Sequence, residues 1–249
     1  MIRISAGNLG SGKTLSEVRE IIKNRYHRNT YTNIEIKGIK NAKLLKSDMI
    51  IKKEIVNYHK NKKSKELEPV YKYSLNIDFW KKINEPVNVV LDEAHSILNS
   101  RRGMSKLNII LTEWLSMLRR ILGENSSGYG ELVLITQLPY RLDGIARDMA
   151  TQVRHHICHY MKICSECNLE WLENTEMPET VSNCMKCGSY KLTKTNHSIE
   201  VIKFKNISDY EQWKVLKEKT YYSRYLIKNA SKFFINYNSY QWDNMFSGF

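Results

Sequence analysis

The stretch Gly7-Asn8-Leu9-Gly10-Ser11-Gly12-Lys13-Thr14 decides the fold of this chain. It fits the phosphate-loop pattern of a glycine, any four residues, then glycine, lysine and serine or threonine. A short apolar strand at residues 2–5 precedes it, and a helix with apolar residues at helical spacing follows from Leu15. Glycines let successive backbone N–H groups close around a β-phosphate. We therefore expect residues 7–14 to bind ATP, with Lys13 on the β- and γ-phosphates and the Thr14 hydroxyl on Mg²⁺.

A second apolar strand, Val87-Asn88-Val89-Val90-Leu91, ends in Asp92-Glu93. Its composition is that of a buried parallel strand, and the carboxyl end of such a strand lies beside the phosphate loop in an open α/β sheet. We expect Asp92 to hold the Mg²⁺ shell, directly or through water, and Glu93 to polarise the attacking water. A solvated carboxylate at a strand end is the alternative for Glu93.

Residues 92–95 also spell Asp-Glu-Ala-His, the box of a helicase class. Those helicases need two RecA-like halves with the ATP between them, and a chain of 249 residues with a metal-binding module has room for only one. We therefore expect His95 to start a helix; a residue that reports on the nucleotide site is the alternative.

A third apolar strand, residues 132–135, runs into Thr136-Gln137. Taken alone, a glutamine after a strand is a polar strand end. Beside the two motifs above, we expect the Gln137 amide to contact the γ-phosphate or the attacking water.

Between these strands, an apolar stripe predicts one helix from Leu107 to Leu122, with Ser105 as its cap and Gly123 as its stop. Its last turn carries Arg119 and Arg120. They are either cations that the helix dipole favours or an arginine finger that reaches the γ-phosphate of a neighbouring subunit. The finger makes sense only in a ring.

Two cysteine pairs, Cys164 with Cys167 and Cys184 with Cys187, have the spacing of a Cys-x2-Cys zinc pattern. Four thiolates complete a closed tetrahedral site, so we expect a structural Zn²⁺. Cys158 fits best as a residue that fills a strand, and a second metal site with its neighbouring histidines is the alternative.

The order of these motifs resembles a known family. In order, the motifs are the phosphate loop, a strand at residues 30–34, Asp92-Glu93-Ala94 with Arg101-Arg102 downstream, Arg119-Arg120, and residues 135–139 followed by Asp143. This order is similar to that of the zonular occludens toxin-like ATPases, and Arg101 and Arg102 are further candidates for the arginine finger. These belong to the FtsK/HerA division of P-loop motors, which includes viral genome-packaging ATPases. The resemblance covers residues 1–160, and it implies a motor that acts on DNA as an oligomeric ring.

The expected fold class is α/β: a P-loop NTPase with a mostly parallel central sheet flanked by helices, plus an inserted zinc ribbon. We expect the ATPase core at residues 1–160 and the zinc-ribbon insertion at 161–197. Residues 198–249 are expected to form a C-terminal strand and an aromatic-rich extension that packs on the core.

The charge of the chain predicts a polyanionic partner. It has 39 basic and 26 acidic residues, a formal net charge of +13, which favours nucleic acid. Lysines crowd residues 37–65, and we expect this segment to be partly loop and to lie near DNA or a procapsid; a solubilising surface is the alternative. No stretch has the apolar length of a membrane span, and Met1-Ile2-Arg3 starts no signal peptide. These features predict a cytoplasmic location, in the host cytoplasm if the chain is viral.

Together these features predict an ATP-driven motor that translocates DNA, most readily double-stranded DNA, and packages a viral genome as a homo-oligomeric ring docked on a capsid or portal-like protein. One alternative is a soluble virion-morphogenesis ATPase of the same family that moves no DNA. Another is a nucleotide-regulated DNA-binding adaptor whose slow hydrolysis serves as a switch.

Overall fold

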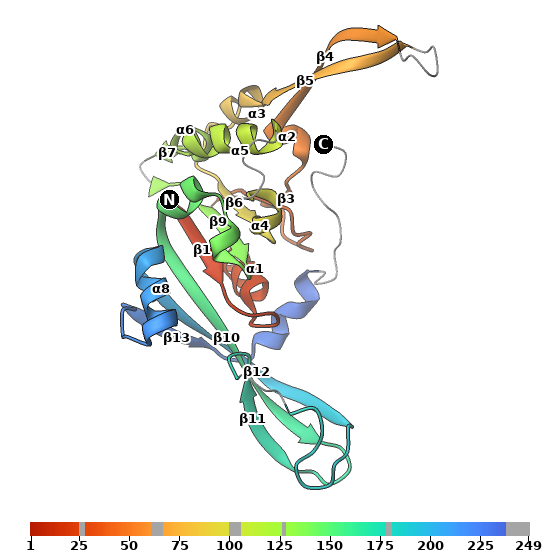
Figure 1. Ribbon diagram of the computed structural model, residues 1–249, viewed down its shortest axis with the longest axis vertical. Coiled ribbons are helices and arrows are strands. Elements are labelled where there is room, and N and C mark those ends of the chain that lie inside the picture. Colours follow the sequence, from red (N-terminus) through yellow and green to blue (C-terminus); the bar gives the residue numbers. More distant parts are fainter. Residues whose placement is uncertain (25–27, 61–66, 100–105, 126–127, 178–180, 238–249) are drawn as a thin grey trace.

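A central sheet organises the molecule (Figure 1). The computed structural model describes residues 1–24, 28–60, 67–99, 106–125, 128–177 and 181–237. Within these ranges the sheet has nine strands in the order β13-β12-β10-β1-β9-β6-β2-β3, with β11 also paired to β10. The strands are β1 (Ile2–Ala6), β2 (Thr30–Thr32), β3 (Ala42–Leu44), β6 (Asn88–Leu91), β9 (Leu132–Thr136), β10 (Ala150–Cys164), β11 (Glu170–Asn174), β12 (Leu192–Phe204) and β13 (Ser223–Ile227).

Strand direction divides the sheet into two parts. The run β10-β1-β9-β6-β2-β3 is parallel throughout. Strands β11 and β12 pair antiparallel with β10, and β13 pairs antiparallel with β12. The expected α/β fold with a mainly parallel central sheet is confirmed.

Helices cover both faces of the sheet. They are α1 (Lys13–Lys23), α2 (Ser47–Ile50), α3 (Ile77–Lys81), α4 (Ala94–Ile97), α5 (Lys106–Ser116), α6 (Leu118–Leu122), η2 (Pro139–Arg141), α7 (Gly144–Asp148), α8 (Ile207–Leu216) and η3 (Ala230–Asn236). On the face of α1, Val18 and Ile21 pack against Val90 and Val133 of the sheet. On the opposite face, α5 and α6 pack against alternate residues of β1, β6 and β9. Because both faces of the sheet are buried here, the sequences of these strands are continuous apolar runs.

The expected single helix at residues 107–122 is wrong in one respect, because it is interrupted at Met117 between α5 and α6. The Ser116 hydroxyl donates a hydrogen bond to the main-chain oxygen of Glu113 at 2.7 Å, an interaction that bends helices. The bend lets Leu118, Ile121 and Leu122 stay in the core. Gly123 follows α6 with a φ of 73°, as a helix stop should, and Ser105 lies outside the described residues.

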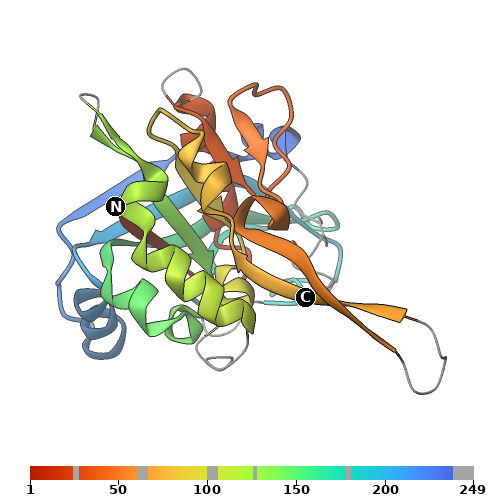
Figure 2. The same ribbon diagram turned by 90° about the horizontal axis from the view of Figure 1, so that it is seen from above.

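The lysine-rich segment contains a β-hairpin that the sequence did not predict. Strands β4 (Ile51–Lys60) and β5 (Leu67–Leu75) form a separate two-stranded sheet that extends from the body of the molecule (Figures 1 and 2). Only its root is buried, through Ile51 and Leu75. The pairing register shifts between Ile55 and Asn57, so that Val56 is an extra residue in β4. A second short pair, β7 (Glu124–Asn125) and β8 (Gly128–Tyr129), lies beside α6.

Several of the described C-terminal aromatic residues pack on the core, whereas Tyr222 and Phe234 are about half exposed. Tyr210, Trp213 and Tyr221 join the main hydrophobic cluster, and Phe233 packs near α1. The aromatic residues after Tyr237 lie outside the described ranges. In the part of the chain that is described, no helix combines the length and apolar character that crossing a bilayer needs.

Candidate nucleotide-binding site

The phosphate loop joins β1 to α1 and is tightly packed against the sheet. Gly7 and Gly12 have φ values of 149° and 84°, in the left-handed region that favours glycine. A Cβ on Gly7 would lie 2.6 Å from the main-chain oxygen of His156 in β10. A Cβ on Gly12 would lie 2.4 Å from Cδ1 of Ile199 in β12. Both positions therefore require glycine for space as well as for backbone conformation.

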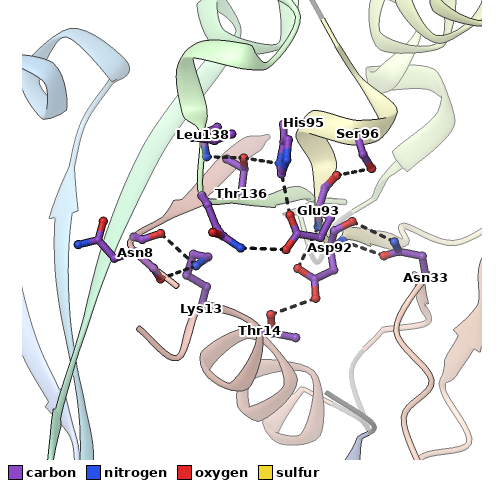
Figure 3. Close-up of polar contacts among 12 residues, drawn as sticks. Asn8, Lys13, Thr14, Asn33, Asp92, Glu93, His95, Ser96, Thr136 and Leu138 are labelled. Atoms are coloured by element: carbon purple, nitrogen blue, oxygen red, sulfur yellow. Dashed lines mark hydrogen bonds and ion pairs between the residues drawn. The ribbon is translucent and has the colours of Figure 1, made fainter. Parts of the chain in front are cut away.

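Lys13 is the first residue of α1, and its side chain lies over the loop. Its Nζ donates hydrogen bonds to the main-chain oxygens of Gly7 at 3.0 Å and Asn8 at 2.9 Å (Figure 3). Burial lowers the pKa of Lys13, while the nearby carboxylates of Glu93 and Asp92 act in the opposite direction. The ammonium group thus lies where phosphates enclosed by the loop would need a cation.

Thr14 and Asp92 bring two oxygen ligands together between α1 and the end of β6. The Thr14 hydroxyl donates to Oδ2 of Asp92 at 3.0 Å (Figure 3). Burial raises the pKa of Asp92, and a bound cation would oppose this by favouring the carboxylate. Hydroxyl and carboxylate oxygens are the hard ligands that Mg²⁺ takes in proteins, so this pair fits a magnesium ion.

Asn33, which follows β2, fixes the position of Asp92. Its amide donates to the main-chain oxygen of Asp92 at 3.0 Å, and its side-chain oxygen accepts from the Asp92 N–H at 2.7 Å. The sequence did not reveal this role, because it depends on the pairing of β2 with β6.

Glu93 has a left-handed backbone conformation, with a φ of 50°. A residue other than glycine in this region carries strain of about 1–3 kcal/mol, and such strain concentrates at functional sites. The conformation is held by the Ser96 hydroxyl, which donates to the main-chain oxygen of Glu93 at 2.8 Å. The Glu93 side chain is 53% exposed, so its carboxylate is open to solvent at the mouth of the site.

The end of β9 lies between β1 and β6 and brings Gln137 to Glu93. The Gln137 amide donates to Oε1 of Glu93 at 3.2 Å (Figure 3). His95 lies on α4, as the expectation of a helix start required, with Nδ1 3.1 Å from the Thr136 hydroxyl. The structure therefore brings Lys13, Thr14, Asp92, Glu93 and Gln137 to one edge of the sheet.

Arg119 and Arg120 do not join this group. Both are exposed on α6, and α6 ends where the Val87 N–H donates to the Leu122 main-chain oxygen at 2.9 Å, just before β6 starts. The nucleotide site lies at the other end of β6, so neither arginine lies at the site of its own chain (Figure 1). Arg101 and Arg102 lie outside the described residues.

The four paired cysteines form one cluster between β10 and β12. The sulfur atoms of Cys164, Cys167, Cys184 and Cys187 all lie within 4.8 Å of one another. The Cys164–Cys187 and Cys167–Cys184 sulfur pairs are 3.6 and 3.4 Å apart. A tetrahedral zinc site with Zn–S bonds of about 2.3 Å separates its sulfurs by about 3.8 Å. The cluster thus has nearly the dimensions of a four-thiolate metal site.

One contact joins the phosphate loop to the segment that follows β11, the strand next to the cysteine cluster. The Asn8 side chain donates to the main-chain oxygen of Thr175 at 2.9 Å, and the Thr175 hydroxyl accepts from the Cys158 N–H at 3.0 Å. The C-terminal segment also lies near the site: the Lys37 N–H donates to the main-chain oxygen of Asn236 at 2.9 Å, and Tyr237 packs against the cluster of Val18 and Val90. Burial, with a smaller effect from the charge of Asp92, raises the pKa of Tyr237 to about 12. Nothing in the local sequence signals either contact.

A phosphate loop between the first strand and first helix, with an aspartate at the end of a parallel strand, defines a P-loop α/β protein. The family model described as zonular occludens toxin (Zot) matches residues 1–203. The chain belongs to this family.

Two solved structures are similar to the chain. The N-terminal domain of zonular occludens toxin from Neisseria meningitidis has 18% identity over 95% of this chain and 98% of that chain, with a TM-score of 0.47. The genome packaging NTPase B204 from Sulfolobus turreted icosahedral virus 2, in complex with ATP-gammaS, has 17% identity over 62% of this chain and 74% of that chain, with a TM-score of 0.36. No curated protein sequence matches the chain.

Proposed function

We propose that this chain is a Mg²⁺-dependent ATPase that translocates DNA, acting as a homo-oligomeric ring in the packaging of a viral genome. The observation that carries the proposal is the convergence of five polar side chains on the phosphate loop: Lys13, Thr14, Asp92, Glu93 and Gln137. Phosphoryl transfer needs positioning and charge stabilisation more than covalent chemistry, and this set provides both.

Each side chain has a distinct role in this proposal. The loop amides of residues 7–14 enclose the phosphates, and Lys13 leaves its carbonyl partners to pair with the β- and γ-phosphate oxygens. Thr14 and Asp92 would hold Mg²⁺, directly or through water, and the ion would supply positive charge that offsets the charge of the phosphates. Glu93 accepts a proton from the attacking water, and Gln137 contacts the γ-phosphate.

The choice of DNA as the partner depends on charge. The net charge of +13 favours a polyanion, and the β4–β5 hairpin presents exposed lysines away from the body of the molecule. Pairing places Lys53 and Lys60 on the same face of the hairpin. Lysines on an extended ribbon can contact successive phosphates.

Double-stranded DNA should stimulate ATP hydrolysis, and replacing Lys53 and Lys60 by Gln should weaken that effect. Each lysine that no longer neutralises a phosphate reduces the steepness of log affinity against log salt by about 1, so the slope should become shallower by up to about 2 in the double variant. Replacing Lys214 and Lys219 near α8 removes the same charge far from the hairpin and is the matched control. Equal slopes in the two variants would contradict a role of the hairpin in DNA binding.

The same experiment separates the alternatives. A morphogenesis ATPase that moves no DNA should hydrolyse ATP at a rate that double-stranded DNA does not change. A nucleotide-regulated adaptor should bind DNA but turn over slowly in single-turnover measurements, whereas a motor must turn over many times per second while bound. A capsid or portal-like protein as the docking partner and the host cytoplasm as the location remain parts of the proposal.

We further propose that the four-cysteine cluster holds one structural Zn²⁺ within a zinc ribbon at residues 161–197. Four thiolates leave no open position on the ion, so it would support folding rather than catalysis. In this proposal the ribbon separates the ATPase core at residues 1–160 from the C-terminal extension at 198–249. Its mixed charge suits contact with a protein or a neighbouring subunit.

Replacing Cys184 by Ser should release the zinc and unfold the region from Cys164 to Cys187. Structural zinc contributes about 10–16 kcal/mol to the folding of small zinc modules, which exceeds what so few apolar residues supply. Elemental analysis should find one zinc per chain in the wild type, and hydrogen exchange should rise only around the ribbon in the variant. ATP binding should largely persist, because the loop amides and Lys13 are unaffected and only the contact between Asn8 and Thr175 is put at risk. A wild-type protein without metal, or with all four thiols reacting at once with a maleimide, would rule the zinc site out.

A further inference from the structure

The carboxylate of Glu93 has a partner on each of its oxygen atoms. Gln137 donates to Oε1 at 3.2 Å, and Nδ1 of His95 lies 3.4 Å from Oε2 (Figure 3). In the proposed function Gln137 turns to the γ-phosphate, and Oε1 is then released for the attacking water. His95 then still faces the carboxylate through Oε2.

His95 is itself held firmly at the end of β9. Its Nδ1 lies 3.1 Å from the hydroxyl oxygen of Thr136, which is 1% exposed. The same hydroxyl oxygen accepts the Leu138 N–H at 3.0 Å, so Thr136 cannot turn away without losing a main-chain hydrogen bond. The imidazole is thus tied to the strand that also carries Gln137.

The proton on Nδ1 of His95 decides how the imidazole can interact with Glu93. An ionised carboxylate only accepts hydrogen bonds, whereas the Thr136 hydroxyl can donate or accept. Without a proton, Nδ1 could accept from Thr136 but would face Oε2 of Glu93 lone pair to lone pair. With a proton, Nδ1 can donate toward Glu93 Oε2 or the Thr136 oxygen. The contact with Glu93 therefore favours the form of His95 that carries a proton on Nδ1.

We propose that His95 is the positioning residue of Glu93: it holds Oε2 through Nδ1–H and aims Oε1 at the attacking water. This inference rests on the proposed function of Glu93 as the base in ATP hydrolysis. The left-handed backbone of Glu93 sets the direction in which its side chain leaves the main chain, and His95 sets the position of its carboxylate. Because His95 is tied to Thr136, the base is aligned relative to the strand that would contact the γ-phosphate.

The test compares three substitutions of His95 that place a hydrogen-bond donor in one of two positions or in neither. The side-chain amide nitrogen of Asn occupies the place of Nδ1, the amide nitrogen of Gln occupies that of Nε2, and Ala has neither. We expect His95→Ala and His95→Gln to lower kcat by about 10- to 100-fold, the effect of a misplaced reacting group. His95→Asn should recover kcat to within about threefold of the wild type, and KM and ATP affinity should stay within about twofold in all three.

Each outcome bears on one of the two proposals. If the wild type hydrolyses ATP and Glu93→Gln does not, but His95→Ala matches the wild type in kcat, the positioning role is wrong. It is also wrong if Asn restores no more activity than Gln, or if the loss appears in KM instead of kcat. If Glu93→Gln remains active, the proposed role of Glu93 fails first, and the inference about His95 fails with it.

Discussion

The Glu93→Gln protein will bind ATP like the wild type and will hydrolyse it about 10²- to 10⁴-fold more slowly, the range that a positioned general base contributes. The substitution keeps the shape of the side chain, but it removes the negative charge that, in the proposed function, lets Glu93 accept the proton of the attacking water. Lys13→Ala will weaken nucleotide binding itself, because in the proposed function the ammonium group contacts phosphates in the ground state as well as in the transition state. Equilibrium titration with a fluorescent ATP analogue and a phosphate-release assay measure the two effects separately.

The pair of variants also provides its own control. A Glu93→Gln protein that still binds ATP must be folded, so its slow hydrolysis cannot be attributed to a loss of folding. A Glu93→Gln protein that hydrolyses ATP within about threefold of the wild-type rate would show that another group takes the proton.

Mixing two inactive variants will restore ATPase activity if Arg119 or Arg120 completes the active site of a neighbour. An arginine finger supplied in trans is worth at least about 10³-fold, so an Arg120→Ala or Arg119→Ala protein should be nearly inactive alone. Mixed with the Glu93→Gln protein, it forms some interfaces that combine an intact Glu93 with an intact arginine. Helix α6 lies at the start of β6, away from the phosphate loop of its own chain. If either arginine has a catalytic role, it therefore acts on the site of a neighbouring subunit.

Dilution supplies the control for the ring. Activity per subunit should fall below the concentration at which the assembly dissociates. Arg101 and Arg102 are the other candidates for the finger. If all four single substitutions leave the rate near that of the wild type, or if activity per subunit is independent of dilution, the ring with trans-acting arginines is wrong and the adaptor alternative gains support.

The elements that form the site could be predicted because each carries a local signal. The phosphate loop has a fixed glycine spacing, and the three buried strands are apolar runs that end in polar residues. Since parallel strands align their carboxyl ends, the sequence also predicted that Asp92 and Gln137 meet near the loop. What it missed are contacts between distant segments, such as Asn33 with Asp92 and Asn8 with Thr175.

The hairpin at residues 51–75 was missed for a different reason. Strand β4 is exposed from Lys52 to Lys60, and β5 is at most partly buried before Leu75. Charged and apolar residues therefore follow one another without the alternation that marks a half-buried strand. The break at Met117 was missed because the apolar stripe continues through it. The hydrogen bond from Ser116 that accompanies the bend is a feature of the structure and not of the apolar pattern. The cysteine cluster, in contrast, could be predicted from its spacing alone.

The extra residue Val56 in β4 decides which side chains of the hairpin act together. In a regular strand, residues separated by an odd number of positions point to opposite sides, and Lys53 and Lys60 are so separated. The register shift reverses the sides of all residues beyond it, which brings Lys60 and Tyr58 to the side of Lys53 and Ile55. Loss of that one uncharged residue would leave the net charge of the hairpin unchanged and yet split its lysines between two sides. The arrangement of charges on the hairpin thus depends on the number of residues in β4 as much as on the lysines themselves.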